Sequence, residues 1–374
     1  MPDMSLSADG TADHLKAHHT LGGHPGSVPT FLLHPGASRP NYFNSRRRQY
    51  DRPGMLRESA SEADVRWPIF VTGSHRSGTT WTAEVLSRGG NIELVDEPFN
   101  ISYRPRRVKR PFPYWFQYIT AENEDEFVEE LDFVFSLRYP IVQVLQASQW
   151  NQLSEYGRQL VSTVKARRSH RRVLCKDPIG VFSAPWIHDR YHCHIIICVR
   201  HPAAFASSLV RLGWAFDFSN WLEQPLFMKD CAGSYAESIE EYATRPPALI
   251  DQAILLWKVI YGRVQVYRDV FPDWCVIRHE DLASDPMGVF PKLYQSCGLE
   301  FGTAARQFIA STTSSNNPIE VPLEDCKVVT RNSAKMGRIW KTRLTAEEVS
   351  HVRARTEREA SGFYSSADWA LSED

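Results

Sequence analysis

One stretch decides the fold of this chain: Gly73-Ser74-His75-Arg76-Ser77-Gly78-Thr79-Thr80-Trp81. It follows the apolar run 67–72 and precedes an apolar-periodic segment that reaches Leu86, an order that predicts strand, glycine-rich loop and helix. The two glycines allow several backbone N–H groups to point at one anion, at a helix N-terminus whose dipole also favours negative charge. The stretch therefore predicts a phosphate-binding loop, with an ordinary strand-to-helix turn as the alternative.

The loop departs from the loops of ATP-hydrolysing proteins at one position. Thr79 stands where those loops carry the lysine that reaches the β- and γ-phosphates. The nearest cation is Arg76, two positions before the second glycine. The loop therefore fits a 5′-phosphate whose donor group is not a γ-phosphate.

A second strand end carries another arginine. The continuous apolar run 194–199 predicts a strand buried on both faces, and it ends at Arg200. Open α/β sheets bind ligands at the carboxyl ends of their strands. Pro202 begins a predicted helix in which Ser208 could turn towards the same ligand. The alternatives are a surface ion pair for Arg200 and a solvated helix position for Ser208.

Together these segments resemble the sulfotransferases that use 3′-phosphoadenosine 5′-phosphosulfate (PAPS). In that family an Arg/Lys-x-Gly-Thr-Thr loop holds the 5′-phosphosulfate, and a later strand-end arginine with a following serine holds the 3′-phosphate. The resemblance covers roughly residues 67 to 345 and implies transfer of the sulfuryl group from PAPS to a hydroxyl acceptor, without a metal. It implies a nucleotide-binding set of Arg76, Ser77, Gly78, Thr79, Thr80, Trp81, Arg200, Ser208 and Arg331.

The same resemblance implies three catalytic residues. Glu97 follows the predicted strand 92–95, where relatives carry a catalytic glutamate that would accept the proton of the acceptor. Lys176, in a Lys-Asp-Pro segment, would act near the bridging oxygen, and Arg76 would stabilise the transferring group. Two alternatives remain open: Glu97 as a strand-end carboxylate paired with a cation, and Lys176 as a lysine paired with Asp177.

Two positions bear on the contacts to adenine. Trp81 would stack on adenine as the family's Thr-Thr-Trp does, and the alternative is a buried tryptophan in the first turn of the helix. His279 replaces the tyrosine of the family's Tyr-Glu-Asp-Leu segment, which puts any contact made by that tyrosine in doubt.

The remaining pattern predicts an α/β fold with a doubly wound, mostly parallel sheet of about five strands and helical insertions. Residues 65–374 are expected to form a single domain, with insertions at 100–170 and 213–248, after a flexible extension at 1–64. Helical stripes are expected at 127–135, 160–164 and 250–264, and capping patterns begin at Asp285 and Thr345. The five predicted strands span 68–72, 92–95, 173–176, 194–199 and 274–278.

Composition excludes several function classes. A formal net charge of −1 over 374 residues argues against a general nucleic-acid or membrane-surface binder. Seven cysteines, without a C-x-x-C pair, do not form a disulfide framework, so we expect a reducing, cytoplasmic compartment. The sequence shows no apolar run of about 18 residues and no signal-peptide pattern at its N-terminus.

Three further interpretations complete the prediction. The cluster His188, His192, Cys193 and His194 lacks a partner pair of typical spacing, so we expect no metal site. One rival function is a P-loop kinase or NTPase, which needs the loop lysine and a strand-end aspartate. The other is a nucleotide-binding protein without catalysis, which would bind adenosine 3′,5′-bisphosphate without transfer.

The acceptor is not named by any motif. Six aromatic residues are candidates to stack on a sugar or another ring: Tyr114, Trp115, Phe116, Trp150, Trp214 and Trp221. The basic run 104–110 follows Glu97 closely and predicts steering of an anionic acceptor such as an acidic glycan or lipid headgroup. The alternative is a solvated loop paired with the acidic segment 122–130.

Overall fold

The computed structural model describes residues 67–102, 107–141, 150–319 and 329–371, all of which belong to one compact unit, Arg57–Asp374. The extension predicted at 1–64 lies outside the described residues. The domain boundaries therefore stay predictions.

The centre of the unit is a parallel sheet of five strands in the order β2-β3-β1-β4-β5. The strands are β1 (Ile69–Thr72), β2 (Ile92–Asp96), β3 (Arg172–Lys176), β4 (His194–Val199) and β5 (Cys275–Arg278). Each predicted strand is confirmed to within one residue at each end. Since β1 lies between β3 and β4, the loop after β1 opens where the strand order reverses, at the edge where such sheets bind ligands.

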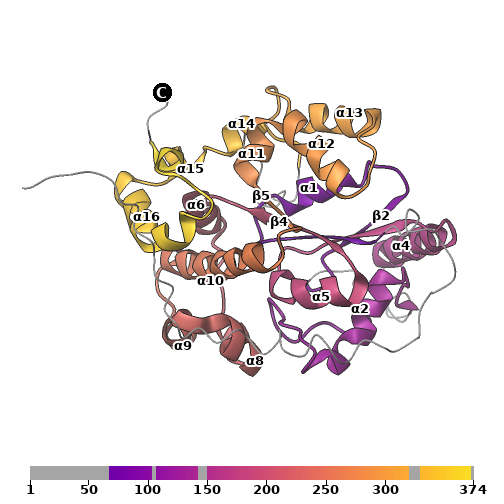
Figure 1. The fold of residues 1–374 in the computed structure, drawn as a ribbon, viewed down its shortest axis with the longest axis horizontal. Coiled ribbons are helices and arrows are strands. Elements are labelled where there is room, and N and C mark those ends of the chain that lie inside the picture. Colours follow the sequence, from indigo (N-terminus) through magenta and orange to yellow (C-terminus); the bar gives the residue numbers. More distant parts are fainter. Residues whose placement is uncertain (1–66, 103–106, 142–149, 320–328, 372–374) are drawn as a thin grey trace, which may run out of the picture. The chain divides into compact units, whose positions relative to one another are not determined.

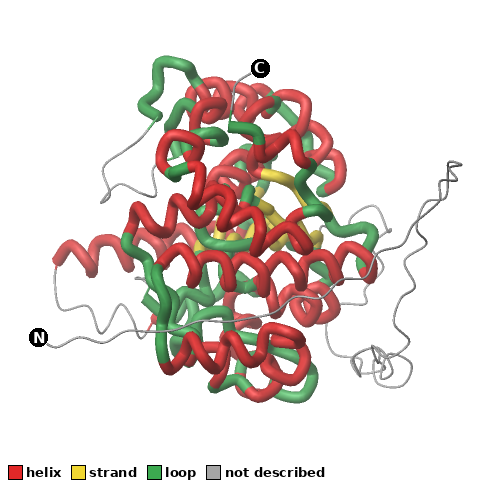
Figure 2. The backbone as a smooth tube through the Cα atoms, turned by 90° about the vertical axis from the view of Figure 1, so that its left-hand side faces the viewer, coloured by secondary structure: helices red, strands yellow, loops and turns green. Residues whose placement is uncertain are grey.

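The two faces of the sheet bury different side chains. Along β4, Ile195, Ile197 and Val199 contribute to one core cluster, whereas Ile196 and Cys198 contribute to the other. Figure 1 shows α12 and α13 on one side of the strands and α5 and α10 on the other, and Figure 2 shows the strands in yellow between helices. The predicted doubly wound α/β architecture is confirmed.

Most of the helices connect or cover the strands. They are α1 (Thr79–Leu86), α2 (Val128–Phe135), α4 (Trp150–Arg168), α5 (Ala184–Tyr191), α6 (Pro202–Leu212), α7 (Ser219–Leu222), α8 (Pro225–Phe227), α9 (Ala236–Thr244), α10 (Leu249–Val270), α11 (His279–Ser284), α12 (Pro286–Ser296), α13 (Thr303–Thr313), α14 (Ser333–Met336), α15 (Trp340–Arg343) and α16 (Ala346–Ala360). Short 3₁₀ or π turns lie at η3 (Glu124–Glu126), η4 (Val181–Ser183), η5 (Met228–Ala232), η6 (Gly233–Tyr235) and η8 (Ser366–Trp369).

The predicted helix starts are confirmed where a capping side chain marks them. Asp285 accepts a hydrogen bond from the N–H of Gly288 at the start of α12. Thr345 and Glu348 form both hydrogen bonds of a capping box at the start of α16. A polar residue in an extended conformation satisfies an N–H group that the helix itself leaves without a partner.

The longest helix, α10, is a core element, as its apolar stripe predicts. Trp257, Tyr261 and Val264 are fully buried. The helix predicted around 160–164 is present as α4, but the prediction of its buried face is wrong. Val161 and Val164 are exposed. Thr163 and Ala166 are buried instead, because the helix packs its smaller side chains inward.

Candidate functional site

The loop after β1 is held against the neighbouring strand. Gly73 approaches β4 so closely that a Cβ atom there would lie 2.3 Å from the carbonyl oxygen of Cys198. The hydroxyl of Tyr261 on α10 lies 2.7 Å from Oγ of Ser74 and donates to the same Cys198 oxygen over 3.1 Å. The loop is thus fixed to the sheet at its first turn.

Three residues of the loop have positive φ angles, and the first of them is Gly73, with a φ of 153°. Gly78 has a φ of 92° and sits at the N-cap of α1, so the loop ends as the helix begins. Arg76 has a φ of 67°, which is uncommon for a residue with a side chain. Such outliers concentrate at functional sites, where the surroundings hold them in place.

A pocket opens beside this loop and receives arginines from three separate segments. Arg76 comes from the loop, Arg200 follows β4, and Arg331 precedes α14. Among the described residues that line the pocket, none is acidic. The full lining is Arg76, Gly78, Thr79, Thr80, Trp81, Arg200, His279, Thr312, Val329, Arg331, Ser333 and Met336. Three guanidinium groups, hydroxyls and the N-terminus of a helix together favour an anion with more than one charge.

Arg200 is almost fully buried, with 4% of its surface exposed. Its Nη1 donates to the backbone carbonyl oxygen of Arg76 over 2.6 Å, and within the described structure its buried Nε has no hydrogen-bond partner. Burial, and then the charge of Arg76, lowers the pKa of Arg200 to about 10. The group remains a cation at neutral pH, but it is a cation that an anionic ligand would stabilise.

Trp81 forms part of the pocket wall and also of the core. Its indole N–H donates to the Thr312 hydroxyl over 3.1 Å, and its ring meets Phe290 edge to face at 5.2 Å. Only 7% of its surface is exposed. Thr312, on α13, is a pocket residue that sequence reasoning missed, since an isolated threonine in a helix carries no signal.

Two residues of the predicted nucleotide set do not line this pocket. Ser77 turns its hydroxyl back into the loop, where it donates to the carbonyl oxygen of Ser74 over 2.6 Å. Ser208, on α6, accepts a hydrogen bond from Nε of Arg76 over 3.3 Å. Both serines therefore brace the loop in this structure.

The strand-end carboxylates gather around one buried lysine. Lys176 is 1% exposed, and its Nζ lies 2.5 Å from Oδ1 of Asp96 and 2.6 Å from Oε1 of Glu97. The alternative pairing with Asp177 is wrong, because that carboxylate accepts instead from the N–H groups of Phe99 and Ile179. Burial alone would lower the pKa of Lys176, but its two carboxylate partners outweigh burial and raise it.

Glu97 occupies a strained position at the end of β2. Its φ is 44°, and its N–H donates to the carbonyl oxygen of Lys176 over 2.8 Å. Oε2 accepts from the side-chain amide of Asn100 over 2.6 Å, while Oε1 accepts from Lys176. Both carboxylate oxygens of Glu97 thus accept a hydrogen bond that fixes the orientation of the group.

His75 is a second residue whose place the sequence did not reveal. Its ring lies 5.4 Å from Phe205, 6.0 Å from Trp214 and 6.1 Å from Phe116, measured between centroids. Burial, and then Arg76, lowers the pKa of His75 to about 4, although the charge of Glu97 opposes this. The imidazole is therefore neutral at neutral pH, and it is close enough to Glu97 for the carboxylate charge to affect its pKa.

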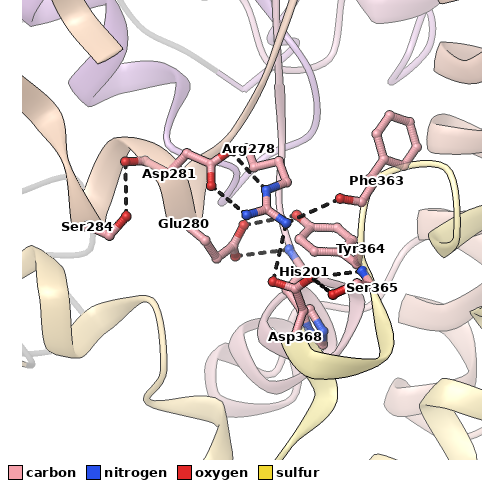
Figure 3. Close-up of polar contacts among 9 residues, drawn as sticks. All are labelled: His201, Arg278, Glu280, Asp281, Ser284, Phe363, Tyr364, Ser365 and Asp368. Atoms are coloured by element: carbon pink, nitrogen blue, oxygen red, sulfur yellow. Dashed lines mark hydrogen bonds and ion pairs between the residues drawn. The ribbon is translucent and has the colours of Figure 1, made fainter. Parts of the chain in front are cut away.

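A hydrogen-bonded network joins the C-terminal segment to residues that are chain neighbours of Arg200 and His279 (Figure 3). Glu280 accepts from the N–H of His201 over 3.0 Å and from the Tyr364 hydroxyl over 2.9 Å. Arg278 forms ion pairs with Asp281 and Asp368. The C-terminal segment thus fastens the ends of β4 and β5, which carry Arg200 and His279.

The aromatic acceptor candidates differ in exposure. Phe116 and Trp221 are buried, so they belong to the core, whereas Trp214 is 40% exposed and lies 5.9 Å from the guanidinium carbon of Arg76. Tyr114 and Trp115 are half-buried. The side chain of Trp150 lies outside the described residues.

Two cations of the basic run 104–110 are paired with acidic residues of the segment 122–130. Lys109 forms an ion pair with Glu129, and Nε of Arg110 lies 3.1 Å from Oε1 of Glu130. The backbone N–H of Lys109 also donates to Glu130, over 2.6 Å. Residues 103–106 lie outside the described part of the chain. For Lys109 and Arg110 the alternative interpretation, a loop paired with the acidic segment, is the one observed.

The described residues hold neither a metal-binding cluster nor a helix suited to a bilayer. No group of three or more His, Cys, Asp and Glu side chains is arranged there to hold a metal ion. In the same residues, every helix is too short or too polar to cross a bilayer.

Comparison with known proteins gives a family match and short local relatives. A model of the sulfotransferase family matches residues 68–303, which is well over half of the chain. Carbohydrate sulfotransferase 2 from mouse, and likewise that from human, is 30% identical over 86 residues. These residues are 22% of this chain and 16% of each relative, so the match spans less than a fifth of the relatives' length.

Among solved structures, the similar ones include sulfotransferases of low sequence identity. The sulfotransferase domain of the olefin synthase from Synechococcus PCC 7002 is 16% identical, with a TM-score of 0.41, over 82% of this chain and 99% of that one. Mouse sulfotransferase SULT7A1, solved in complex with PAP, is 16% identical, with a TM-score of 0.40, over 82% of this chain and 88% of that one.

Proposed function

This chain belongs to the sulfotransferase family, and we propose that it transfers the sulfuryl group of PAPS to a hydroxyl acceptor, with carbohydrates as the favoured class. One observation carries the choice of donor: Arg76, Arg200 and Arg331 line a single pocket at a phosphate loop that lacks the lysine of nucleotide triphosphatases. PAPS has phosphate groups at both ends of its ribose, which matches cations contributed by separated segments.

The two anionic ends of the donor would meet different parts of the pocket. Arg76 and the N–H groups at the start of α1 are proposed to hold the 5′-phosphosulfate. Arg200 and Arg331 are proposed to hold the 3′-phosphate. Ser208 would also contact this phosphate once its hydrogen bond with Arg76 is broken. The adenine would lie against the wall at Trp81, on the small part of that ring that is exposed.

The transfer itself needs one proton acceptor and stabilisation of charge. The acceptor hydroxyl oxygen forms a bond to sulfur while the bond from sulfur to the bridging oxygen breaks. The hydroxyl proton passes to Glu97, and the negative charge left on the bridging oxygen stays with the departing nucleotide. Arg76 stabilises that charge, and positioning supplies most of the remaining rate enhancement, as in phosphoryl transfer.

Lys176 has a narrower proposed role than donation to the bridging oxygen. Its ammonium group is buried between Asp96 and Glu97, so it orients the Glu97 carboxylate.

The proposed acceptor class rests on two supports. The short local relatives are carbohydrate sulfotransferases. In addition, the exposed ring of Trp214 lies beside Arg76, and exposed aromatic rings stack well on the apolar faces of sugars. An anionic acceptor and the cytoplasmic location stay predictions from the sequence.

The decisive experiment is transfer from radiolabelled PAPS by the purified protein, with panels of sugars, phenols, lipids and peptides as acceptors. Label should appear in at least one hydroxyl compound and be lost in Glu97→Gln. Turnover that requires ATP and Mg²⁺ instead would favour the kinase alternative. Tight binding of adenosine 3′,5′-bisphosphate without transfer to any acceptor would favour a nucleotide-binding protein without catalysis.

A further inference from the structure

Among the described residues that line the pocket, His279 is the one whose side chain has an ordinary pKa close to neutral pH. It stands at the junction of β5 and α11, where the family resemblance leads one to expect a tyrosine. The imidazole lines the same pocket as Arg76, Arg200 and Arg331. A residue that can be neutral or cationic has thus replaced one that stays neutral in this pH range.

The ring is packed against the phosphate loop. A Cβ atom built on Gly78 would lie 2.4 Å from Nδ1 of His279, so this nitrogen faces the loop at its last glycine. Within the part of the chain that the structure describes, Nδ1 is buried and has no hydrogen-bond partner. A buried imidazole nitrogen without a partner costs free energy, and such a group is often completed by a ligand.

The surroundings of His279 explain why the ring is neutral here. Burial comes first, followed by the charges of Arg200, Arg76 and Arg331, and together they lower the pKa of His279 to about 3. The carboxylate that follows it, Glu280, is engaged by the N–H of His201 and the hydroxyl of Tyr364.

The other charged groups around this ring are also engaged or face away. Arg278 on β5 is held by Asp281 and Asp368. Lys335 on α14, which packs on α11, is exposed and does not line the pocket. Burial and the arginines of the pocket therefore decide the charge state of His279.

We propose that His279 takes up a proton when a nucleotide with two phosphate groups enters the pocket, and that the imidazolium then becomes a ligand of those phosphates. This inference rests on the proposed function, because it needs a polyanionic nucleotide as the natural ligand. The phosphate charges offset the repulsion from the three arginines, and they add an attraction that only the protonated ring can use. Binding and protonation then favour one another.

The linkage has a definite sign. Because the complex binds one proton more than the free protein, affinity must rise as pH falls from about 8 towards the pKa of the free phosphate groups. One linked proton changes the dissociation constant by at most roughly tenfold per pH unit. The phosphates themselves act in the opposite direction, since they lose charge below a pKa of about 6. A comparison with a variant that lacks the imidazole separates the two effects.

The test is calorimetry of adenosine 3′,5′-bisphosphate binding between pH 6.5 and 8, in buffers with different ionisation enthalpies, so that proton uptake is measured directly. Wild-type protein should take up a proton fraction that grows as pH falls. His279→Gln and His279→Tyr should lose this uptake and show a flatter pH dependence of the dissociation constant. The matched control is His201→Phe, which removes a buried histidine outside the nucleotide pocket and should leave the uptake unchanged.

Each outcome decides a different claim. Equal proton uptake in wild type and His279→Gln would overturn this inference while leaving the proposed function intact. Absence of bisphosphate binding by the wild type would instead refute the proposed donor. If neither variant folds, the imidazole resonances of the wild type can be titrated by NMR with and without the nucleotide. The proposal then requires one histidine whose pKa rises on binding, and it fails if none does.

Discussion

Arg200 donates a hydrogen bond from its guanidinium group to the backbone carbonyl oxygen of Arg76 over 2.6 Å. The cation that follows β4 therefore holds the phosphate loop in shape as well as facing the pocket. Removal of Arg200 should therefore affect two kinds of ligand differently. The lost charge weakens ligands with a 3′-phosphate, whereas the lost hydrogen bond to Arg76 weakens every ligand of the loop.

Replacing Arg200 with alanine should weaken adenosine 3′,5′-bisphosphate by about 2–3 kcal/mol, the value of a charge-assisted contact in a buried site. AMP should also bind more weakly, but by less, since it loses only the brace on Arg76 and no contact to a 3′-phosphate. Titration calorimetry with both nucleotides measures the difference. Equal losses for the two would refute assignment of Arg200 to the 3′-phosphate. Ser208→Ala should act in the same direction with a smaller effect.

Replacing Glu97 with glutamine should slow transfer by roughly 10²–10⁴-fold while nucleotide affinity stays nearly constant. The amide preserves the shape and one acceptor oxygen for Lys176, but it cannot take the proton of the acceptor. Single-turnover rates and bisphosphate affinity report the two quantities separately. A variant that keeps most of its rate would show that another group accepts the proton.

Lys176 supports a cluster that should fail without it. In Lys176→Met, Asp96 and Glu97 lose their shared cation and repel each other in a partly buried place. Breaking a buried ion pair costs about 3–5 kcal/mol, so the free energy of unfolding should fall by that order. Chemical denaturation measures this fall, and the double variant Lys176→Met with Glu97→Gln should recover part of it. No recovery would mean that the lysine stabilises through packing alone.

Gly78 offers a test of loop geometry with an internal control. Gly78 and Gly90 both have left-handed φ angles, 92° and 108°, but only at Gly78 would an added Cβ meet a neighbour, the ring of His279. Gly90→Ala should cost only the backbone strain, about 1–2 kcal/mol of stability. Gly78→Ala should cost a similar amount and also displace His279, with a loss of bisphosphate affinity that is roughly tenfold or greater. Equal nucleotide affinity in the two variants would contradict this account.

His201 predicts a pH dependence of stability. It is 1% exposed, stacks on Trp340 at 4.8 Å, and its pKa is lowered to about 3, first by burial. Below pH 6.5, the ordinary pKa of histidine, His201 binds a proton in the unfolded chain but not in the folded one. The free energy of unfolding therefore falls as pH falls. His201→Phe keeps the stack and removes this penalty. Relative to wild type, it should gain about 2 kcal/mol at pH 5 compared with pH 7.5, as measured by denaturation.

The strands and the phosphate loop could be predicted because their signals are local. An apolar run such as 194–199 is stable only as a strand buried between two layers of helices. Gly78, placed after a strand and before a helix, indicates a tight turn. The capping box at Thr345 was visible for the same reason, since both of its partners lie within four residues.

The contents of the pocket could be predicted only in part, because they depend on contacts between distant segments. Thr312 reaches Trp81 across 231 positions, and nothing in its own neighbourhood indicates this. The positive φ angles of Arg76 and Glu97 are likewise imposed by tertiary contacts and leave no trace in composition. The face of α4 was missed because apolar spacing alone does not tell which side meets the core.

The network in Figure 3 decides where this chain can be shortened. The family match ends at residue 303. Beyond it, Tyr364 donates a hydrogen bond to Glu280, and Asp368 forms an ion pair with Arg278. Glu280 and Arg278 lie on either side of the pocket residue His279. A fragment that stops at the family boundary would keep every strand of the sheet and the whole loop. It would also leave Glu280 without its tyrosine and lose Arg331 itself. For expression of fragments and for fusion partners, the segment that carries Tyr364 and Asp368 should therefore be kept, because it supports the residues on either side of His279.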